Sequence, residues 1–231
     1  MARFPLLGGD TRRIAEADSV AVIGLGRFGR ALALELMESG TEVLGIDVDE
    51  EIVQALNGEL TQVVRADSTK PEVLRQLAVD EFDRVVVAIG SDLQSSIITA
   101  SVLVGMGIPS VWAKATNDQH AQILEQLGVH KVISPEKDMG KRVAHLVRGA
   151  ALDFIEVGHG YALVKTGVPA RLLGVRLGDT ALRTKYGVTI AAFARPDGAW
   201  QNADQDTVLA EGDTVLAVGA TRAAENFAQL R

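Results

Sequence analysis

A glycine-rich turn between a strand and a helix constrains this chain most. An apolar run, Val20–Ile23, is followed at once by the segment GLGRFG, which spans residues 24–29. Apolar residues then recur at helical spacing up to Gly40, and a second apolar run ends at Asp47. This order of strand, tight turn, helix and strand predicts the nucleotide-binding half of a doubly wound α/β fold.

Each glycine of the turn has a physical role in such a fold. Gly24 permits the sharp turn, Gly26 lets the backbone approach a pyrophosphate, and Gly29 lets the helix pack close to the strand. The amides at the helix start form an anion site. Asp47 follows about twenty residues on, where a carboxylate can accept the ribose hydroxyls of a nucleotide. We therefore expect nucleotide binding; the alternative is a turn whose glycines serve packing only.

Arg27 is unusual within this turn. A long cation competes for the space that the second half of a dinucleotide would cross. A guanidinium does, however, grip the terminal oxygens of a phosphate chain in a bidentate way. We therefore interpret Arg27 as a contact to a phosphate chain that ends at the turn. The alternative is a solvated arginine on the first helical turn, where it would oppose the helix dipole.

The alternation of strands and helices continues to about residue 135. Further strands are predicted at 62–66, 84–89, 110–115 and 131–134, with helices at 50–60, 73–77, 93–106 and 118–127 between them. Together these elements predict a doubly wound, parallel, six-stranded Rossmann-like sheet. Its ligand crevice lies outside the carboxyl ends of the strands.

That edge collects further candidate residues. Asp67 and Ser68 follow the third strand and can reach the base of a bound nucleotide, whereas Asp67 is equally well explained as the N-cap of the next helix. Gly90 follows the fourth strand, and Lys114 lies in the fifth.

A smaller α+β domain is predicted after the sheet. The helix predicted at 139–151 leaves the sheet after its last strand, so we expect it to pack against a second subunit. Beyond it, strands are predicted at 154–157, 161–168, 188–194 and 214–218, with helices at 180–185 and 222–230. We place a flexible N-terminal tail at 1–18, the nucleotide-binding domain with its last helix at 19–152, and the second domain at 153–231.

One basic cluster stands out in the second domain. Arg171, Arg176, Arg183 and Lys185 lie close in sequence, with only Asp179 among them. Such a cluster is usually a solvated face, and the alternative is a site for a phosphate-bearing effector.

Composition excludes several classes of protein. The net charge of -7 and the lack of a basic face argue against nucleic acid as a partner. The absence of cysteine excludes a disulfide framework, a thiolate zinc site and a cysteine nucleophile. The longest apolar stretch, 97–108, is interrupted by polar residues and glycines and is too short to span a bilayer. We therefore do not expect the chain by itself to be a channel or transporter.

The sequence also lacks the common catalytic motifs. There is no HExxH, GxSxG or GxxxxGK[ST] segment. None of the four histidines lies in a motif with a partner carboxylate, and we expect His120 and His145 to be exposed on helices. These patterns favour a protein that binds a nucleotide and changes shape in response over an enzyme.

Six blocks of the sequence, in order, resemble the KtrA/TrkA family of bacterial potassium-uptake regulatory subunits. The blocks are VIGLGRFG, VVVAIGSDLQSS, VWAKA, SPEKDMG, RTKYGVTIAA and EGDTVLAVG. The resemblance implies an RCK nucleotide-binding domain followed by a TrkA-C domain. It also implies a cytoplasmic homo-octameric ring of dimers, docked at the inner face of the plasma membrane beneath a KtrB- or TrkH-like potassium-translocating subunit. ATP would favour the conducting state and ADP the inactive one, through binding rather than hydrolysis.

The resemblance also implies roles for individual residues. Glu136 would help to bind a divalent cation, Mg²⁺ or Ca²⁺, where two nucleotides meet across the dimer. Relatives often carry asparagine at the position of Asp49. A cyclic di-AMP site would involve Arg171, Arg176 and Lys185. The expected nucleotide contacts are Gly24, Gly26, Arg27, Phe28, Gly29, Asp47, Asp49, Asp67, Ser68, Ile89, Gly90, Ser91 and Lys114.

Two other interpretations stay open. The ring could sense NAD(H) instead of ATP and ADP, as some Trk-type members do, since Asp47 can accept the 2′-hydroxyl of either ligand. The chain could also be an NAD-dependent oxidoreductase.

Overall fold

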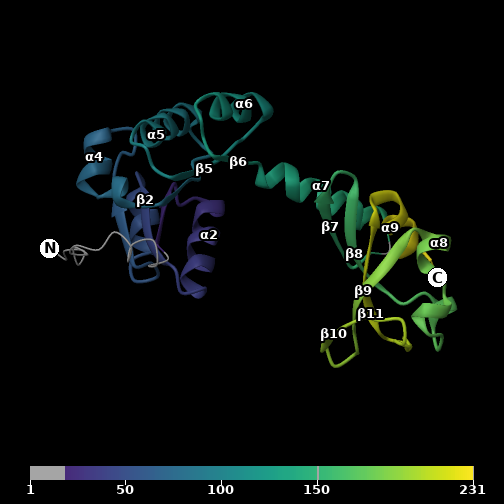
Figure 1. Ribbon diagram of the computed structural model, residues 1–231. Coiled ribbons are helices and arrows are strands. Elements are labelled where there is room, and N and C mark those ends of the chain that lie inside the picture. The colour runs from purple at the N-terminus through teal and green to yellow at the C-terminus, as the bar shows by residue number, and fades with distance from the viewer. Residues whose placement is uncertain (1–18, 150, 231) are drawn as a thin grey trace. The chain divides into compact units, whose positions relative to one another are not determined.

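The structure is a computed structural model that describes residues 19–149 and 151–230 (Figure 1). The predicted N-terminal tail at 1–18 therefore lies outside the described residues. Contacts divide the chain into two compact units that meet between Pro135 and Glu136. Each unit has its own sheet and its own hydrophobic core, and each is described by itself.

The first unit contains the predicted parallel sheet of six strands, in the order β3-β2-β1-β4-β5-β6. Its strands are β1 (Ser19–Ile23), β2 (Glu42–Asp47), β3 (Gln62–Arg65), β4 (Arg84–Val87), β5 (Ser110–Lys114) and β6 (Lys131–Ile133). Its helices are α2 (Arg27–Glu38), α3 (Glu50–Ala55), α4 (Pro71–Gln76), α5 (Leu93–Gly105) and α6 (Asp118–Gln126), with a 3-10 turn at Val79–Glu81. Every pairing between neighbouring strands is parallel, which confirms the predicted doubly wound fold.

Helices cover both faces of this sheet, so its central strands are apolar on both sides. In β1, Val20 and Val22 pack in one core cluster with Ala33 of α2, whereas Ala21 and Ile23 belong to the other cluster. Helices α4, α5 and α6 contribute to the second cluster, and Figure 1 shows them together on one side of the sheet. Burial on both faces explains the nearly unbroken apolar runs of the sequence.

Two helices of the first unit differ from the predicted ranges. α3 ends at Ala55 instead of residue 60, because the chain turns at Gly58 with φ +90°, a conformation that a helix cannot contain. α4 begins at Pro71, earlier than the predicted residue 73, with the proline at a first-turn position where its missing amide costs nothing.

The second unit contains an antiparallel sheet of five strands, in the order β10-β9-β11-β8-β7. Its strands are β7 (Asp153–Gly158), β8 (Tyr161–Gly167), β9 (Val188–Ala194), β10 (Trp200–Asn202) and β11 (Thr214–Ala220). Its helices are α7 (Pro135–Arg148), α8 (Leu182–Tyr186) and α9 (Thr221–Ala228), with 3-10 turns at Ala170–Leu172 and Leu177–Asp179. The predicted α+β character is confirmed. β10 was not predicted, because three exposed residues carry no apolar alternation.

Helix α7 belongs with the second unit rather than with the sheet that precedes it. It begins at Pro135, four residues before the predicted start, and Leu146 and Ala151 pack against the second core. Arg142 holds Asp153 at the start of β7 through a 2.6 Å ion pair. The compact units therefore meet at residue 135, earlier than the boundary expected at residue 152.

Among the described residues, no helix combines the length and the apolar character needed to cross a bilayer.

Gly29 provides a test of how α2 packs on the turn. A Cβ atom at Gly29 would lie 1.9 Å from the carbonyl oxygen of Gly24, so Gly29→Ala must displace the helix. We expect the variant to lose about 1–3 kcal/mol or more of unfolding free energy, measured by urea denaturation. Gly26→Ala is the matched control, because nothing outside the adjacent chain lies within 4 Å of its Cβ position. Equal stability of the two variants would contradict this packing.

The ion pair between α7 and β7 predicts a pH-dependent stability. The hydrogen bond from Arg142 lowers the pKa of Asp153 below its ordinary value. A lowered folded-state pKa stabilises the fold above the unfolded pKa, about 3.9, and this stabilisation is lost as the pH falls through the folded pKa. We expect Arg142→Ala to melt below wild type at pH 7 and to converge with it in acid. Lys141→Ala, on the same helix, serves as control; a pH-independent difference would argue against the ion pair.

Candidate nucleotide-binding site

The glycine turn lies between β1 and α2, and its three glycines have different reasons to be glycine. Gly24 has φ +90°, and a Cβ there would lie 2.8 Å from the backbone nitrogen of Ile89. A Cβ at Gly29 would clash with the carbonyl oxygen of Gly24, as described above. Gly26 has an ordinary φ of -61° and open space around its Cβ position. Packing within the protein therefore explains Gly24 and Gly29, whereas no contact within the described protein requires glycine at position 26.

The start of α2 provides donors beside that space. Gly26 is the N-cap residue, and no side chain accepts a hydrogen bond from the first amides of the helix. The first turn also contains no acidic residue. Uncapped amides and the positive end of the helix dipole together attract an anion.

Asp47 joins the turn to the loop after β2. Its Oδ2 accepts a hydrogen bond from the Leu25 amide at 2.6 Å, and its Oδ1 accepts one from the Asp49 amide at 2.9 Å. The carboxylate therefore helps to hold the turn in place, together with the Gly24 amide, which donates to the Ile46 carbonyl at 2.8 Å. Asp49 in turn caps α3 by accepting a bond from the Glu51 amide at 2.9 Å.

The two residues Asp67 and Ser68, which follow β3, are both held by hydrogen bonds. Asp67 accepts bonds from the Thr69 amide and hydroxyl at 3.0 and 2.6 Å, and the hydroxyl bond is the main cause of its lowered pKa. The N-cap of α4 is Lys70, so the alternative interpretation of Asp67 as that cap was wrong. Ser68 is only 4% exposed, and its hydroxyl lies 2.9 Å from that of Thr99 on α5. The Ser68 hydroxyl is thus engaged inside the protein.

Lys114 approaches the turn from β5. The residue is 9% exposed, and its Nζ lies 5.7 Å from the centre of the Phe28 ring. The same atom lies 3.3 Å from the position that a Cβ of Gly90 would take. A buried ammonium is therefore held where the glycine turn and the loop after β4 converge. Gly90 and Ser91 are exposed beside it.

Arg27 is the first residue of α2, and its side chain is exposed. In the part of the chain that the structure describes, it makes no hydrogen bond or ion pair.

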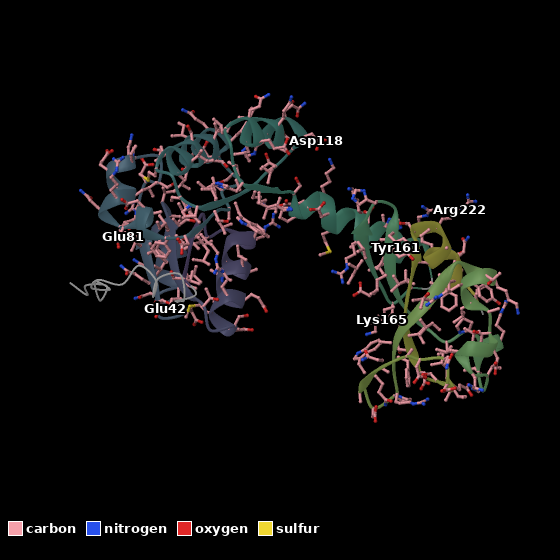
Figure 2. The ribbon with its side chains drawn as sticks, in the orientation of Figure 1. Glu42, Glu81, Asp118, Tyr161, Lys165 and Arg222 are labelled. Atoms are coloured by element: carbon pink, nitrogen blue, oxygen red, sulfur yellow. The ribbon has the colours of Figure 1, made fainter. Side chains whose placement is uncertain are left out.

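Figure 2 labels one residue near each edge of the parallel sheet. Glu42 begins β2 at the amino edge, and Asp118 begins α6 just after the carboxyl end of β5. The turn, Asp47, Asp67, Gly90 and Lys114 all lie at or just after carboxyl ends of strands, as predicted.

The other expected ligand sites lie in the second unit. Glu136 is exposed in the first turn of α7, and the described residues hold no group of three or more acidic or histidine side chains suited to a metal ion. Arg176 pairs with Asp206, a partner thirty positions away that the local sequence pattern did not reveal. Arg171 lies over the ring of Tyr186, and Lys185 is exposed on α8.

The expectation of exposed helical histidines was wrong. His120 is 1% exposed at the start of α6, and burial lowers its pKa. His145 is half-buried, and its Nδ1 lies 2.5 Å from Oε1 of Glu225. The two residues of this pair are 80 positions apart, so no local motif could have indicated it.

Two family models match the chain in order. The TrkA-N domain matches residues 20–135, and the TrkA-C domain matches residues 162–230. The first match covers the parallel sheet, and the second covers most of the antiparallel one.

Solved structures show the same fold, and two of them serve as examples. The GsuK channel bound to NAD matches with a TM-score of 0.51 and 23% identity, over 92% of this chain and 38% of the channel chain. This chain therefore spans less than half of the channel. The TrkA-N domain of the inner membrane protein ybaL from Escherichia coli matches with a TM-score of 0.51 and 18% identity, over 57% of this chain and 97% of that domain.

Curated relatives are more similar in sequence. Ktr system potassium uptake protein C of Bacillus subtilis (strain 168) is 36% identical over 208 residues, which cover 90% of this chain and 94% of the relative. Ktr system potassium uptake protein A of Vibrio alginolyticus is 38% identical over 200 residues, which cover 86% and 91%. The family resemblance seen in the sequence is thereby confirmed: the chain belongs to the family of Ktr potassium uptake proteins, with a TrkA-N domain followed by a TrkA-C domain.

Proposed function

We propose that this chain is a nucleotide-sensing regulatory subunit of a potassium uptake system, activated by ATP and inactivated by ADP. The open space over Gly26, beside an Arg27 without a bond of its own among the described residues, is the observation that carries this proposal. The names of the relatives, potassium uptake proteins of Ktr systems, support the process that the subunit serves.

The site fits a nucleotide group by group. A phosphate chain over Gly26 would accept bonds from the uncapped amides of α2, with the Lys114 ammonium adding positive charge. Each carboxylate oxygen of Asp47 already accepts one backbone amide. A carboxylate oxygen has about two lone pairs, so each can still accept a ribose hydroxyl. Asp67, exposed after β3, would contact the base.

Arg27 would supply the difference between ATP and ADP. A ligand shifts a conformational equilibrium only by its difference in affinity for the two states. An exposed guanidinium at the helix start can grip the γ-phosphate of ATP and has no such group to grip in ADP. A difference of a few kcal/mol in binding free energy between the two states, summed over several subunits, would then determine which conformation an oligomeric ring adopts. Binding rather than turnover is the signal, so we propose no enzymatic activity.

The proposal includes the assembly that the family resemblance implies. The chain would form dimers within a homo-octameric cytoplasmic ring at the inner face of the plasma membrane, docked on a membrane-embedded potassium-translocating subunit. Exposed apolar residues support a second copy at α7: Met139, Val143 and Val147 recur every four residues. Leu146 of the same helix packs against the core of the second unit instead. Glu136 would bind Mg²⁺ or Ca²⁺ between subunits, and Arg171, Arg176 and Lys185 remain a proposed cyclic di-AMP site.

A second candidate ligand is NAD(H). The GsuK channel, whose structure is described as bound to NAD, shares the fold of the first unit. Asp47 would hold the adenosine ribose of NAD in the same way, but the second half of the dinucleotide would have to pass Arg27. We therefore place NAD(H) second, ahead of an NAD-dependent oxidoreductase.

Arg27→Ala tests the proposed switch. We expect ATP affinity, measured by isothermal titration calorimetry, to fall about tenfold or more through loss of a charged hydrogen bond. ADP affinity should change little. Arg30→Ala, one helical turn on and also exposed, is the matched control and should keep both affinities. An equal loss of affinity for ATP and for ADP in Arg27→Ala would contradict the proposed discrimination between the two nucleotides.

Gly26→Val tests whether the open space belongs to the ligand. Its side chain meets no protein atom at the Cβ position, so the fold should keep its melting temperature within a few degrees. The branched side chain would occupy the place of the phosphates, so binding of both ATP and ADP should be lost. Wild-type affinity in this variant would place the phosphates elsewhere.

A further inference from the structure

A cavity of about 300 Å³ lies within the second unit, apart from the nucleotide turn. The end of α7, strands β7 and β8, and helix α9 form its walls. Its volume falls at the lower end of the range for small-molecule sites. Its lining includes the apolar residues Phe154, Val164 and Ala228 together with charged and amide side chains.

A histidine held by a carboxylate forms part of this lining. The His145 ring stacks on Phe154 with centroids 4.0 Å apart and an interplanar angle of 15°. Its Nδ1 lies 2.5 Å from Oε1 of Glu225 on α9. Stacking and this bond fix the orientation of the ring. They leave Nε2 as the ring nitrogen without a partner among the described residues, and they occupy the one carboxylate of the lining.

Two arginines add positive charge to the same cavity. Arg148 is the last residue of α7, and Arg222 is the second residue of α9, where Figure 2 labels it. Neither makes a hydrogen bond or ion pair with another residue that the structure describes. Arg148 also offsets the negative end of the α7 dipole, but that role leaves its guanidinium donors unused.

We propose that this cavity binds a small phosphate-bearing anion through Arg148, Arg222 and His145. Donors from two helices converge on one cavity, and a tetrahedral phosphate offers three or more oxygens to them, whereas a planar carboxylate offers two. Glu225 orients the imidazole through Nδ1 so that Nε2 can face the ligand. The apolar wall at Phe154 and Val164 suits an organic group attached to the phosphate.

Such a ligand would fasten α7 to the last helix of the unit. Arg148 and Arg222 lie on different helices, so an anion shared between them opposes separation of the end of α7 from α9. α7 is also the element that follows directly on the nucleotide unit in the chain. The site is therefore placed to regulate how firmly that helix is held.

The test is a titration of the full chain with inorganic phosphate at constant ionic strength, followed by the side-chain NMR signals of its histidines. The signal of His145 is identified by its loss in His145→Gln. We expect this signal to shift with saturation in the millimolar range or below. Phosphate at the glycine turn would instead move the signal of His120, which lies in the first unit just after the carboxyl end of β5. The readout therefore separates this site from the nucleotide site.

Variants decide whether the arginines are the ligands. Arg148→Gln and Arg222→Gln should each raise the phosphate concentration that half-saturates the His145 shift about tenfold, and the double variant should abolish the shift. Lys141→Gln removes one positive charge from an exposed position of α7 outside the cavity lining and should have no effect. The melting temperature and the nucleotide affinity of the arginine variants should stay near wild type. A loss of phosphate binding can then be distinguished from a loss of folding or of the nucleotide site.

A second probe distinguishes an organic phosphate from inorganic phosphate as the ligand of this cavity. Phenyl phosphate should bind more tightly than inorganic phosphate if the apolar wall holds an organic group, and equal binding would assign the site to phosphate itself. Absence of any His145 shift up to tens of millimolar of either probe would overturn the proposal. An unchanged shift in the double arginine variant would overturn it as well.

Discussion

The close approach of α2 to the end of β1 is the constraint on which the rest of the nucleotide unit depends. A Cβ at Gly29 would lie 1.9 Å from the Gly24 carbonyl oxygen, so only glycine lets the helix begin there. This contact places the uncapped amides of α2 at the carboxyl edge of the sheet. Asp47 fixes the same turn through the Leu25 amide, and thereby couples β2 to it. The packing of the fold and the shape of the anion site thus come from one set of contacts.

Asp47 and Lys114 show how one residue can serve the fold and the ligand together. Both oxygens of Asp47 accept backbone amides, which fixes the carboxylate before any ligand arrives. Lys114 is buried against Phe28 beside Gly90. Groups that are already ordered lose little conformational entropy on binding. In our account, Arg27 is the polar side chain of the turn that stays mobile before the ligand binds. The γ-phosphate that distinguishes ATP from ADP would therefore be sensed by this one side chain.

Much of the first unit could be predicted from sequence because its signals are local. The glycine spacing, the apolar runs and the acid at the end of β2 predicted six parallel strands and the edge of the sheet at which the candidate residues gather, but not the order of the strands. Contacts between distant residues could not be predicted: His145 with Glu225, Arg176 with Asp206, and Ser68 with Thr99 each join separate elements. The side of α7 that faces the core could not be predicted for the same reason. Leu146 packs against the second core whereas Val143 is exposed, and this difference depends on the contacts of α7 with β7 and α9.

The central claim is that the glycine turn senses ATP and ADP, and ligand-dependent melting of the full chain tests it most directly. A ligand that binds only the folded state raises the melting temperature by mass action. The account predicts that ATP and ADP each raise it, that Mg²⁺ or Ca²⁺ adds to the effect of ATP, and that NADH has the smaller effect. Stabilisation by NADH alone, or by none of these nucleotides, would contradict it.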